Sequence, residues 1–291
     1  MARVVVVGSL NVDHTVQVER FPAPGETVTA SGYTFGLGGK GFNQAVTAAR
    51  MGVDVVMVGC VGADTDGDLL FQTLHEERID ASYVRRSELP TGRAHLTVDS
   101  TGQNSIVVVP GANAGASFPS AALEEADVLL AQLECPLDTV TSALAAARAA
   151  NVVTILNPAP ARPLSESLLA LVDYLVPNER ESEELGRVEF RGTAIVTGGE
   201  SGALLLVPGQ QERRVAPFSV PVVDTTGAGD AFCGCFAASV AERLPIADAL
   251  RRASAAGACA VTRAGAFASL PTRDEVEQMV ARAQPSSESH S

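Results

Sequence analysis

The sequence predicts an α/β fold: a mostly parallel β-sheet with helices on both faces, and a small antiparallel β lid that stands off the sheet. From about residue 36 onward, short apolar runs alternate with Ala- and Leu-rich segments of helical length. This alternation is typical of parallel strands joined by crossover helices. Two segments, about residues 14–36 and 91–110, instead alternate apolar and polar residues, as antiparallel strands with one exposed face do.

The main sheet is expected to begin with RVVVVG at residues 3–8, whose four consecutive valines indicate a strand buried on both faces. Further strands are expected at residues 54–62, 126–133, 152–156, 174–176, 193–196 and 203–207. The segment 66–77 is expected to be a helix with Leu69, Leu70 and Leu74 facing inward. Further helices are expected at residues 139–150, 231–244 and 246–262, with a last one after the loop RAGAFASLP.

The composition indicates one domain over residues 1–291, with a frayed tail at 284–291. With 21 basic and 34 acidic residues the formal net charge is −13, which argues against nucleic acid or an anionic membrane as a partner. The five cysteines include no CxxC pair and are expected to be reduced thiols. We find neither a signal peptide nor an apolar run long enough to cross a bilayer, so the expected location is cytoplasmic.

Polar side chains follow several of the expected strands, at the point where each strand ends. Asn11 and Asp13 follow the first strand, and Glu134 and Asn178 follow two later ones. The carboxyl ends of parallel strands share one edge of the sheet, and ligands of open α/β sheets bind at that edge. Asn and Asp are also common turn formers, so Asn11 and Asp13 taken alone have a purely structural explanation. Their recurrence at one edge favours a binding site.

A glycine-rich turn at residues 36–51, GLGGKGFNQAVTAARM, runs into an Ala-rich helix. Its glycines allow a ligand to approach the backbone closely, while Lys40 and Asn43 supply a charge and an amide. The spacing is not that of a phosphate-binding P-loop, which reads G-x-x-x-x-G-K-[ST]. A loop that only caps the helix is the alternative explanation.

A second glycine-rich turn, VVDTTGAGDAFCGCF at residues 222–236, has a carboxylate on each side of its glycines, Asp224 and Asp230. Free N–H groups at the start of the following helix, together with the helix dipole, make an anion site. Asp230 is then expected to accept the proton of a hydroxyl that attacks phosphorus. Its place at a helix N-terminus predicts a low pKa, so it would take the proton late. The alternative is that Asp230 is a helix N-cap.

The two turns carry the signatures GGKGFNQA (38–45) and DTTGAGDAF (224–232), and on these the chain resembles the ribokinase-like (PfkB-type) carbohydrate kinase family. The segments GSLNVD, FPAPGETV, GANA, LNPAPA and PNE match the same family, and the resemblance runs from Val4 to about Pro271. It implies a three-layer fold and ATP-dependent transfer of the γ-phosphoryl group to the O5 hydroxyl of D-ribose, giving ribose 5-phosphate.

The resemblance also implies roles for residues that match the family's motifs. Asp230 would be the catalytic base, and the backbone of Gly227, Ala228 and Gly229 the anion hole. The sugar would be bound by Asn11, Asp13, Gly39, Lys40, Asn43, Glu134 and Asp230. ATP would contact Asn178, Thr197, Gly199, Ser201, Gly202, Gly229, Asp230 and Ser254.

Two ions belong to the same set of expectations. Glu181 would help to place Mg²⁺ through water. An activating K⁺ would be held, several times through backbone carbonyls, by Asp224, Thr226, Ala260, Arg263, Gly265 and Ser269. For Asp224 the alternative is an N-cap of the turn.

The lid predicts how the chain assembles. Its strands are expected to present apolar residues that a monomer would leave exposed, namely Val16, Val18, Val28, Ile106 and Val108. An isologous homodimer in which two lids clasp each other would cover them, and the family resemblance points the same way. The lid is also expected to close over the sugar and keep water from the reaction.

The chain departs from the family pattern in two places. The link from Asn178 to Thr197 is short, which predicts that one peripheral helix is missing or reduced. Ser254 stands where many relatives have His or Asn, so the adenine contacts there stay open.

Asn11 with Asp13 favours a substrate with vicinal hydroxyls such as ribose, and a kinase for deoxyribose, a keto-sugar or a nucleoside is the alternative. A non-catalytic sugar or nucleotide sensor is a remote alternative because Asp230 is intact. GSLNVD after the first strand, in place of G-x-G-x-x-G, argues against a nicotinamide-dependent oxidoreductase.

Overall fold

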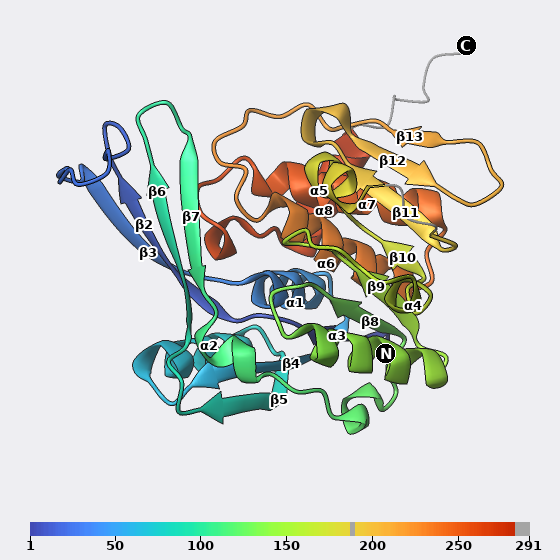
Figure 1. Ribbon diagram of the computed structural model, residues 1–291. Coiled ribbons are helices and arrows are strands. Elements are labelled where there is room, and N and C mark those ends of the chain that lie inside the picture. Colours follow the sequence, from blue (N-terminus) through green and yellow to red (C-terminus); the bar gives the residue numbers. More distant parts are fainter. Residues whose placement is uncertain (187–189, 283–291) are drawn as a thin grey trace, which may run out of the picture.

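A twisted sheet forms the centre of the molecule, and helices cover both of its faces (Figure 1). The structure is a computed structural model that describes residues 1–186 and 190–282, so the tail expected at 284–291 lies outside the described residues. Within them the sheet has nine strands in the order β13-β12-β11-β10-β9-β8-β1-β4-β5. In this part of the chain β12 alone runs opposite to the direction that the other strands of the sheet share. The strands are β1 (Arg3–Val7), β4 (Asp54–Gly62), β5 (Asp80–Ser87), β8 (Val128–Ala131), β9 (Val153–Leu156), β10 (Tyr174–Leu175), β11 (Thr193–Thr197), β12 (Ala203–Leu206) and β13 (Arg213–Val215).

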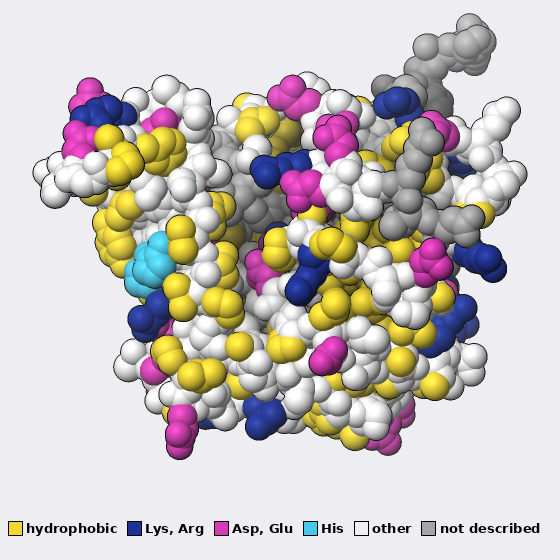
Figure 2. Space-filling view, in the orientation of Figure 1, with side chains coloured by type: hydrophobic (Ala, Val, Ile, Leu, Met, Phe, Trp, Pro, Cys, Tyr) yellow, Lys and Arg dark blue, Asp and Glu magenta, His cyan; other side chains and the backbone are white. Residues whose placement is uncertain are grey.

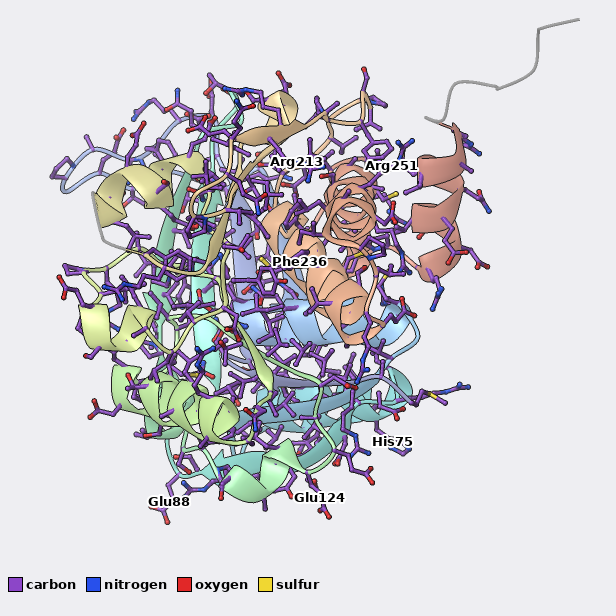
Figure 3. All side chains as sticks on the ribbon, turned by 90° about the vertical axis from the view of Figure 1, so that its right-hand side faces the viewer. His75, Glu88, Glu124, Arg213, Phe236 and Arg251 are labelled. Atoms are coloured by element: carbon purple, nitrogen blue, oxygen red, sulfur yellow. The ribbon has the colours of Figure 1, made fainter. Side chains whose placement is uncertain are left out.

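The valines of β1 show why helices cover both faces of the sheet. Val4 and Val6 belong to one apolar cluster, and Val5 and Val7 belong to a second cluster on the other face; all four are fully buried. The first cluster packs against α1 (Lys40–Arg50), α2 (Thr65–Glu76), α6 (Ala228–Ala241), α7 (Ile246–Ala260) and α8 (Arg273–Arg282), and Phe236 lies at its centre (Figure 3). The second packs against α3 (Leu137–Ala149) and α4 (Glu166–Leu169). The predicted α/β fold is confirmed.

Two local expectations about the helices are corrected. In α2, Leu70 and Leu74 are fully buried as expected, but Leu69 is 37% exposed because it points about 100° away from Leu70 around the helix. The helix α6 begins at Ala228, earlier than expected, because Gly227 adopts the left-handed conformation (φ 79°) and caps it. In its described part, the short link before β11 holds one helix, α5 (Glu179–Leu185).

The lid is a second sheet of four strands, in the order β3-β2-β6-β7, that stands beside the main body (Figure 1). Its strands are β2 (Asn11–Gln17), β3 (Gly32–Gly38), β6 (Gly92–Val98) and β7 (Asn104–Val109). The two outer pairs are antiparallel, but the central pair β2–β6 is parallel, so the expectation of an antiparallel lid is wrong there. The reason is that β2 continues from β1 and β6 continues from β5, and β1 and β5 run in the same direction in the main sheet.

The lid presents apolar side chains to its surroundings. Every residue of β7 is exposed, including Ile106 and Val108 at 51% and 44%. Figure 2 shows hydrophobic side chains gathered around the histidines of the lid, where His14 and His95 stack with ring centroids 5.3 Å apart. Val18 and Val28 do not lie on lid strands, and Val18 is buried, so these two expectations are wrong. None of the helices in the described residues combines the length and apolar character that a membrane crossing needs.

Candidate active site

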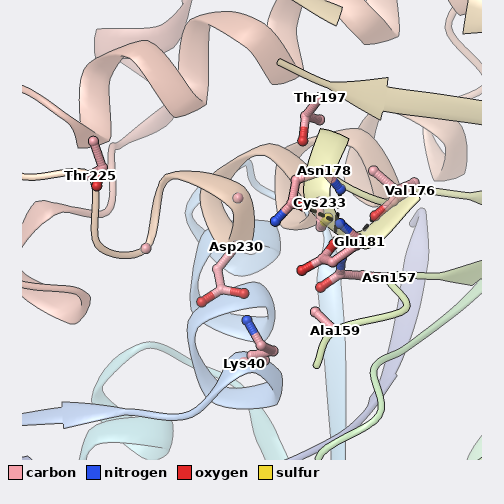
Figure 4. A pocket seen from close by; sticks show the side chains of 12 residues that line it. Lys40, Asn157, Ala159, Val176, Asn178, Glu181, Thr197, Thr225, Asp230 and Cys233 are labelled. Atoms are coloured by element: carbon pink, nitrogen blue, oxygen red, sulfur yellow. Dashed lines mark hydrogen bonds between the residues drawn. The ribbon is translucent and has the colours of Figure 1, made fainter. Parts of the chain in front are cut away.

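A cavity of about 200 Å³ lies where β9, β10 and β11 end and α6 begins (Figure 4). This is the edge at which polar side chains were expected to meet. The cavity is lined by Lys40, Asn157, Ala159, Val176, Asn178, Glu181, Thr197, Thr225, Gly227, Gly229, Asp230 and Cys233. It therefore joins the first glycine-rich turn, through Lys40, to the second, through Asp230.

Asp230 is buried in the first turn of α6, and two side chains of α1 hold its carboxylate. The amide of Asn43 donates to Oδ2 at 3.0 Å, and that of Gln44 donates to Oδ1 at 2.9 Å. The helices approach closely enough because α6 has Gly234 at their contact, where a Cβ atom would lie 2.4 Å from the Gln44 carbonyl. Asp230 is not the N-cap of α6, so this alternative is excluded.

The expectation of a low pKa for Asp230 is wrong. Burial raises the pKa of this carboxyl, while the charge of Lys40 and the hydrogen bonds from Asn43 and Gln44 lower it without fully offsetting burial. The helix N-terminus alone could not reveal this, because burial of the side chain comes from the packing of α1 on α6.

Lys40 supplies positive charge to the same cavity, and Figure 4 shows its amine facing the Asp230 carboxylate. Burial lowers the pKa of Lys40, but the nearby carboxylates of Asp230, Glu134 and Glu181 more than compensate, so the net shift is upward. The ammonium is therefore protonated at neutral pH, as a group that binds phosphate oxygens must be.

The second glycine-rich turn forms one wall of the cavity. Thr225, Gly227 and Gly229 line it, whereas the N–H of Ala228 makes a long bond of 3.3 Å back to the Thr225 carbonyl. A side chain at Gly227 is disfavoured both by its φ of 79° and by Ala266, whose Cα would lie 3.2 Å from a Cβ atom. Backbone at the start of α6 thus faces the cavity, as an anion site requires.

Next to Asp230, toward the lid, lie the residues expected to bind the sugar. Glu134 accepts a hydrogen bond from the Ser9 hydroxyl and a 3.2 Å bond from the Lys40 backbone N–H. Gly39 is needed at this point, because a Cβ atom there would lie 2.9 Å from the backbone nitrogen of Asn11. The side-chain oxygen of Asn43 is buried without a hydrogen-bond partner among the described residues. It is therefore an acceptor that a hydroxyl group could satisfy.

Asp13, on strand β2 of the lid, belongs to the residues expected to bind the sugar. Burial raises the pKa of Asp13 to about 7, and the negative charges of Glu134 and Asp230 add to the rise. Three carboxylates are therefore brought together from β2 of the lid, from the end of β8 and from α6. Such a cluster suits the recognition of several hydroxyl groups, since each carboxylate accepts hydrogen bonds.

The residues expected to bind the nucleotide lie on the opposite side of the cavity. Asn178 and Glu181 form a capping box at the start of α5, with N–H···O distances of 2.7 and 2.9 Å, and both line the cavity. Thr197 also lines it, while the 3₁₀ turn Gly199–Ser201 and Gly202 follow β11 without lining it. Ser254 lies on α7, outside the cavity lining, and its buried hydroxyl has no partner within the described chain.

The donors available for Mg²⁺ are few. Among the described residues, no group of three or more His, Cys, Asp or Glu side chains could hold a metal ion. Glu181 offers one carboxylate in the cavity, which fits Mg²⁺ bound mainly by water and phosphate oxygens. Mg²⁺ held this way would neutralise the charge of a transferring phosphoryl group.

The expected cation loop lies directly behind the second glycine-rich turn. The carboxylate of Asp224 accepts bonds from the Thr226 N–H at 2.9 Å, its hydroxyl at 2.7 Å and the Gly265 N–H at 2.8 Å. Asp224 therefore closes an Asx turn and ties it to the loop, and the pKa of this carboxyl is lowered by these bonds in spite of burial. Its place fits a cation bound with loop carbonyls, although the Ser269 carbonyl already accepts from the Arg263 guanidinium at 3.1 Å.

Besides Thr225 in the cavity wall, five polar residues that hydrogen-bond around the site were missed as functional candidates. Ser9 donates a hydrogen bond to Glu134, and Asn113 donates to the Asn11 side chain at 2.7 Å. Gln44, Gln132 and Asn157 form a chain of hydrogen bonds that starts at Asp230. Four of these five stand in the motifs GSLNVD, GANA, GGKGFNQA and LNPAPA, so a signal was available. Gln132 stands in an apolar strand segment and gave none.

Comparison with known proteins matches residues 1–273 to the family described as pfkB family carbohydrate kinase. The chain belongs to this family. A ribokinase of Haemophilus influenzae is 38% identical over 301 residues, which cover 96% of this chain and 98% of the relative. A deoxyribokinase of Salmonella typhi is 35% identical over 299 residues, covering 94% and 97%.

Solved structures agree with the sequence relatives. The structure of Arabidopsis thaliana ribokinase complexed with ribose and ATP superimposes with a TM-score of 0.88 at 32% identity, covering 96% of this chain and 99% of the other. The chain is therefore a sugar kinase with a ribokinase-like fold.

Proposed function

We propose that this kinase transfers the γ-phosphoryl group of ATP to the O5 hydroxyl of D-ribose. The observation that carries the proposal is the buried Asp230 carboxylate, fixed by Asn43 and Gln44 in the first turn of α6 and facing Lys40 across the cavity. A phosphoryl acceptor needs a base near its hydroxyl and positive charge near the phosphate, and this arrangement offers both.

In the proposed reaction the sugar oxygen attacks the γ-phosphorus while the bond from phosphorus to the ADP oxygen breaks. The hydroxyl proton passes to Asp230, and the developing negative charge is stabilised by Lys40 and by the backbone N–H groups of Gly227 and Gly229. Because the pKa of Asp230 is raised by burial, it is a better base than an exposed aspartate.

The sugar is proposed to lie between the lid and the body, held by Asn11, Asp13, Asn43 and Glu134. Asn113 supports this because it donates to the side-chain oxygen of Asn11 at 2.7 Å, which leaves the Asn11 NH₂ group for a substrate oxygen. The nucleotide is proposed to occupy the side of the cavity that Asn178 and Thr197 line, and to extend toward Gly202 after β11, with Mg²⁺ near Glu181.

Ribose and deoxyribose are the two substrates to separate, because relatives named for each are similarly identical to this chain. A coupled ADP-release assay with D-ribose and with 2-deoxy-D-ribose, at matched concentrations, decides between them. We expect higher kcat/KM for D-ribose. Higher kcat/KM for 2-deoxy-D-ribose would overturn the choice of sugar, and no ADP release above an Asp230→Asn control with any sugar would overturn the kinase role.

We also propose a homodimer assembled through the lids, in the cytoplasm. The support is the apolar exposure of β7 and of Tyr33 and Phe35 on β3, at 59% and 44%. A monomer would leave this surface and the β7 edge in water.

A further inference from the structure

A buried row of side-chain amides starts at Asp230 and includes Gln44, Gln132 and Asn157. Gln44 on α1 donates through one NH₂ group to Asp230 Oδ1 at 2.9 Å and to the Asn157 oxygen at 3.2 Å. Gln132, one residue beyond β8, donates to the Gln44 oxygen at 2.7 Å. Gln44 and Gln132 are fully buried and Asn157 is 8% exposed.

Each amide in the row can face only one way. Asn157, which lines the cavity in Figure 4, donates to the backbone carbonyl of Val176 at 2.8 Å. Its oxygen is therefore the atom that accepts from Gln44. The oxygen of Gln44 is occupied by Gln132, so its NH₂ group must face Asp230 and Asn157. A flipped Gln44 would set its oxygen against the Asp230 carboxylate and lose three hydrogen bonds.

The row is not explained by packing alone. Buried polar networks specify a structure only if every member is satisfied, and apolar side chains would fill the space without that requirement. Here one atom, the Gln132 oxygen, has no partner among the described residues, which destabilises the fold. The charged group that the row meets is Asp230.

We propose that Gln44 is a positioning residue for phosphoryl transfer, because it holds the Asp230 carboxylate in one orientation, and that Gln132 sets the direction of the Gln44 amide. This rests on the proposed role of Asp230 as base. With Asn43 on Oδ2 and Gln44 on Oδ1, the carboxylate cannot rotate without breaking both bonds. The lone pairs left over are then directed at the substrate hydroxyl.

The bond from Gln44 also favours the ionised form of Asp230. Burial raises the pKa of Asp230, and the Gln44 hydrogen bond is one of the interactions that lower it. Loss of the N–H donor therefore raises the pKa further, and the acid side of the pH profile of kcat/KM moves to higher pH. A merely structural residue would change the amount of folded enzyme and leave that pH profile in place.

The test compares Gln44→Met with the wild-type enzyme, because Met has similar length and no N–H. We expect kcat to fall about 10- to 100-fold through misorientation of the base, with the KM values for sugar and ATP nearly unchanged. The midpoint of the acid limb of the kcat/KM pH profile is expected to move to higher pH by about one unit. Gln132→Met should lower kcat and move the acid limb to higher pH as well, but by less, because the hydrogen bond from Gln44 to Asp230 survives.

Thr154→Val is the matched control, since Thr154 is also fully buried and hydrogen-bonded, to Leu171 and Asp173, away from the cavity. It should lower the melting temperature without moving the pH profile. If Gln44→Met and Gln132→Met keep the wild-type kcat and acid limb while Asp230→Asn is inactive, the positioning role is wrong and the base role stands. If Asp230→Asn is fully active, both the positioning role of Gln44 and the base role of Asp230 are wrong. If Gln44→Met does not fold, a Gln132→Met acid limb at the wild-type pH overturns the proposal.

Discussion

Replacement of Asp13 by Asn should stabilise the folded protein at alkaline pH while it weakens the sugar site. Burial and the negative charges of Glu134 and Asp230 raise the pKa of Asp13 from its ordinary 3.8 to about 7. No hydrogen bond to the Asp13 carboxylate is present within residues 1–186 and 190–282 to offset this. The ionised carboxylate is therefore held in an unfavourable place by the fold.

The size of the stability loss caused by ionised Asp13 follows from proton linkage. Because the pKa is higher in the folded than in the unfolded state, the folded protein binds more protons between pH 4 and 7, and its stability falls as the pH rises. Each unit of pKa difference corresponds to about 1.4 kcal/mol, so the loss is small near pH 4 and reaches up to about 4 kcal/mol above pH 7. The Asp13→Asn variant has no carboxyl at this position and would escape the loss.

Thermal unfolding of both proteins at pH 5 and pH 8, without ligand, measures this effect. The melting temperature of Asp13→Asn should exceed that of the wild type at pH 8, by about 2 °C or more for each kcal/mol, and by clearly less at pH 5. Asp54→Asn, at an exposed position at the start of β4, is the control and should show no such gain. An Asp13→Asn gain that is absent, or equal at the two pH values, would refute the electrostatic argument. The sugar KM of the same variant should rise, because Asn offers one acceptor oxygen instead of two.

Asp230→Asn should leave sugar and ATP binding nearly intact and lower kcat by about two to four orders of magnitude, as measured by ADP release, and an unimpaired variant would remove Asp230 from the mechanism. K⁺ should activate the enzyme and Na⁺ poorly, with Asp224→Ala imitating K⁺ removal; equal turnover in K⁺-free buffer would contradict this. Val108→Lys should shift the molar mass in light scattering toward that of the monomer, and an unchanged mass would exclude the lid as the interface. Val18 is buried, so a charge there cannot serve as this test.

The fold was predictable because its main signals are local. Apolar runs mark the strands, and β4 has the bounds 54–62 that its composition predicts. The two glycine-rich turns could also be placed at one site, because parallel strands end at a common edge.

What the sequence does not show depends on packing between distant elements. Gln44 and Gln132 meet only because α1 and β8 are neighbours in space, and the raised pKa of Asp230 results from burial that no local pattern reports. The direction of β6 in the lid depends on the path of the chain through β5.

The parallel centre of the lid has a consequence for the order of folding. In the β2–β6 pair, Asn11 lies opposite Gly92, and β4, α2 and β5 of the body intervene along the chain. A pairing across so long a loop is slow to form, because the loop must close before its contacts stabilise it. The lid cannot assemble independently of the main sheet. The hairpins β2–β3 and β6–β7 each form locally, but they pair with each other only after β1, β4 and β5 have brought the starts of β2 and β6 together. During synthesis the N-terminal hairpin β2–β3 therefore leaves the ribosome well before β6, and until then the edge of β2 that pairs with β6 stays open.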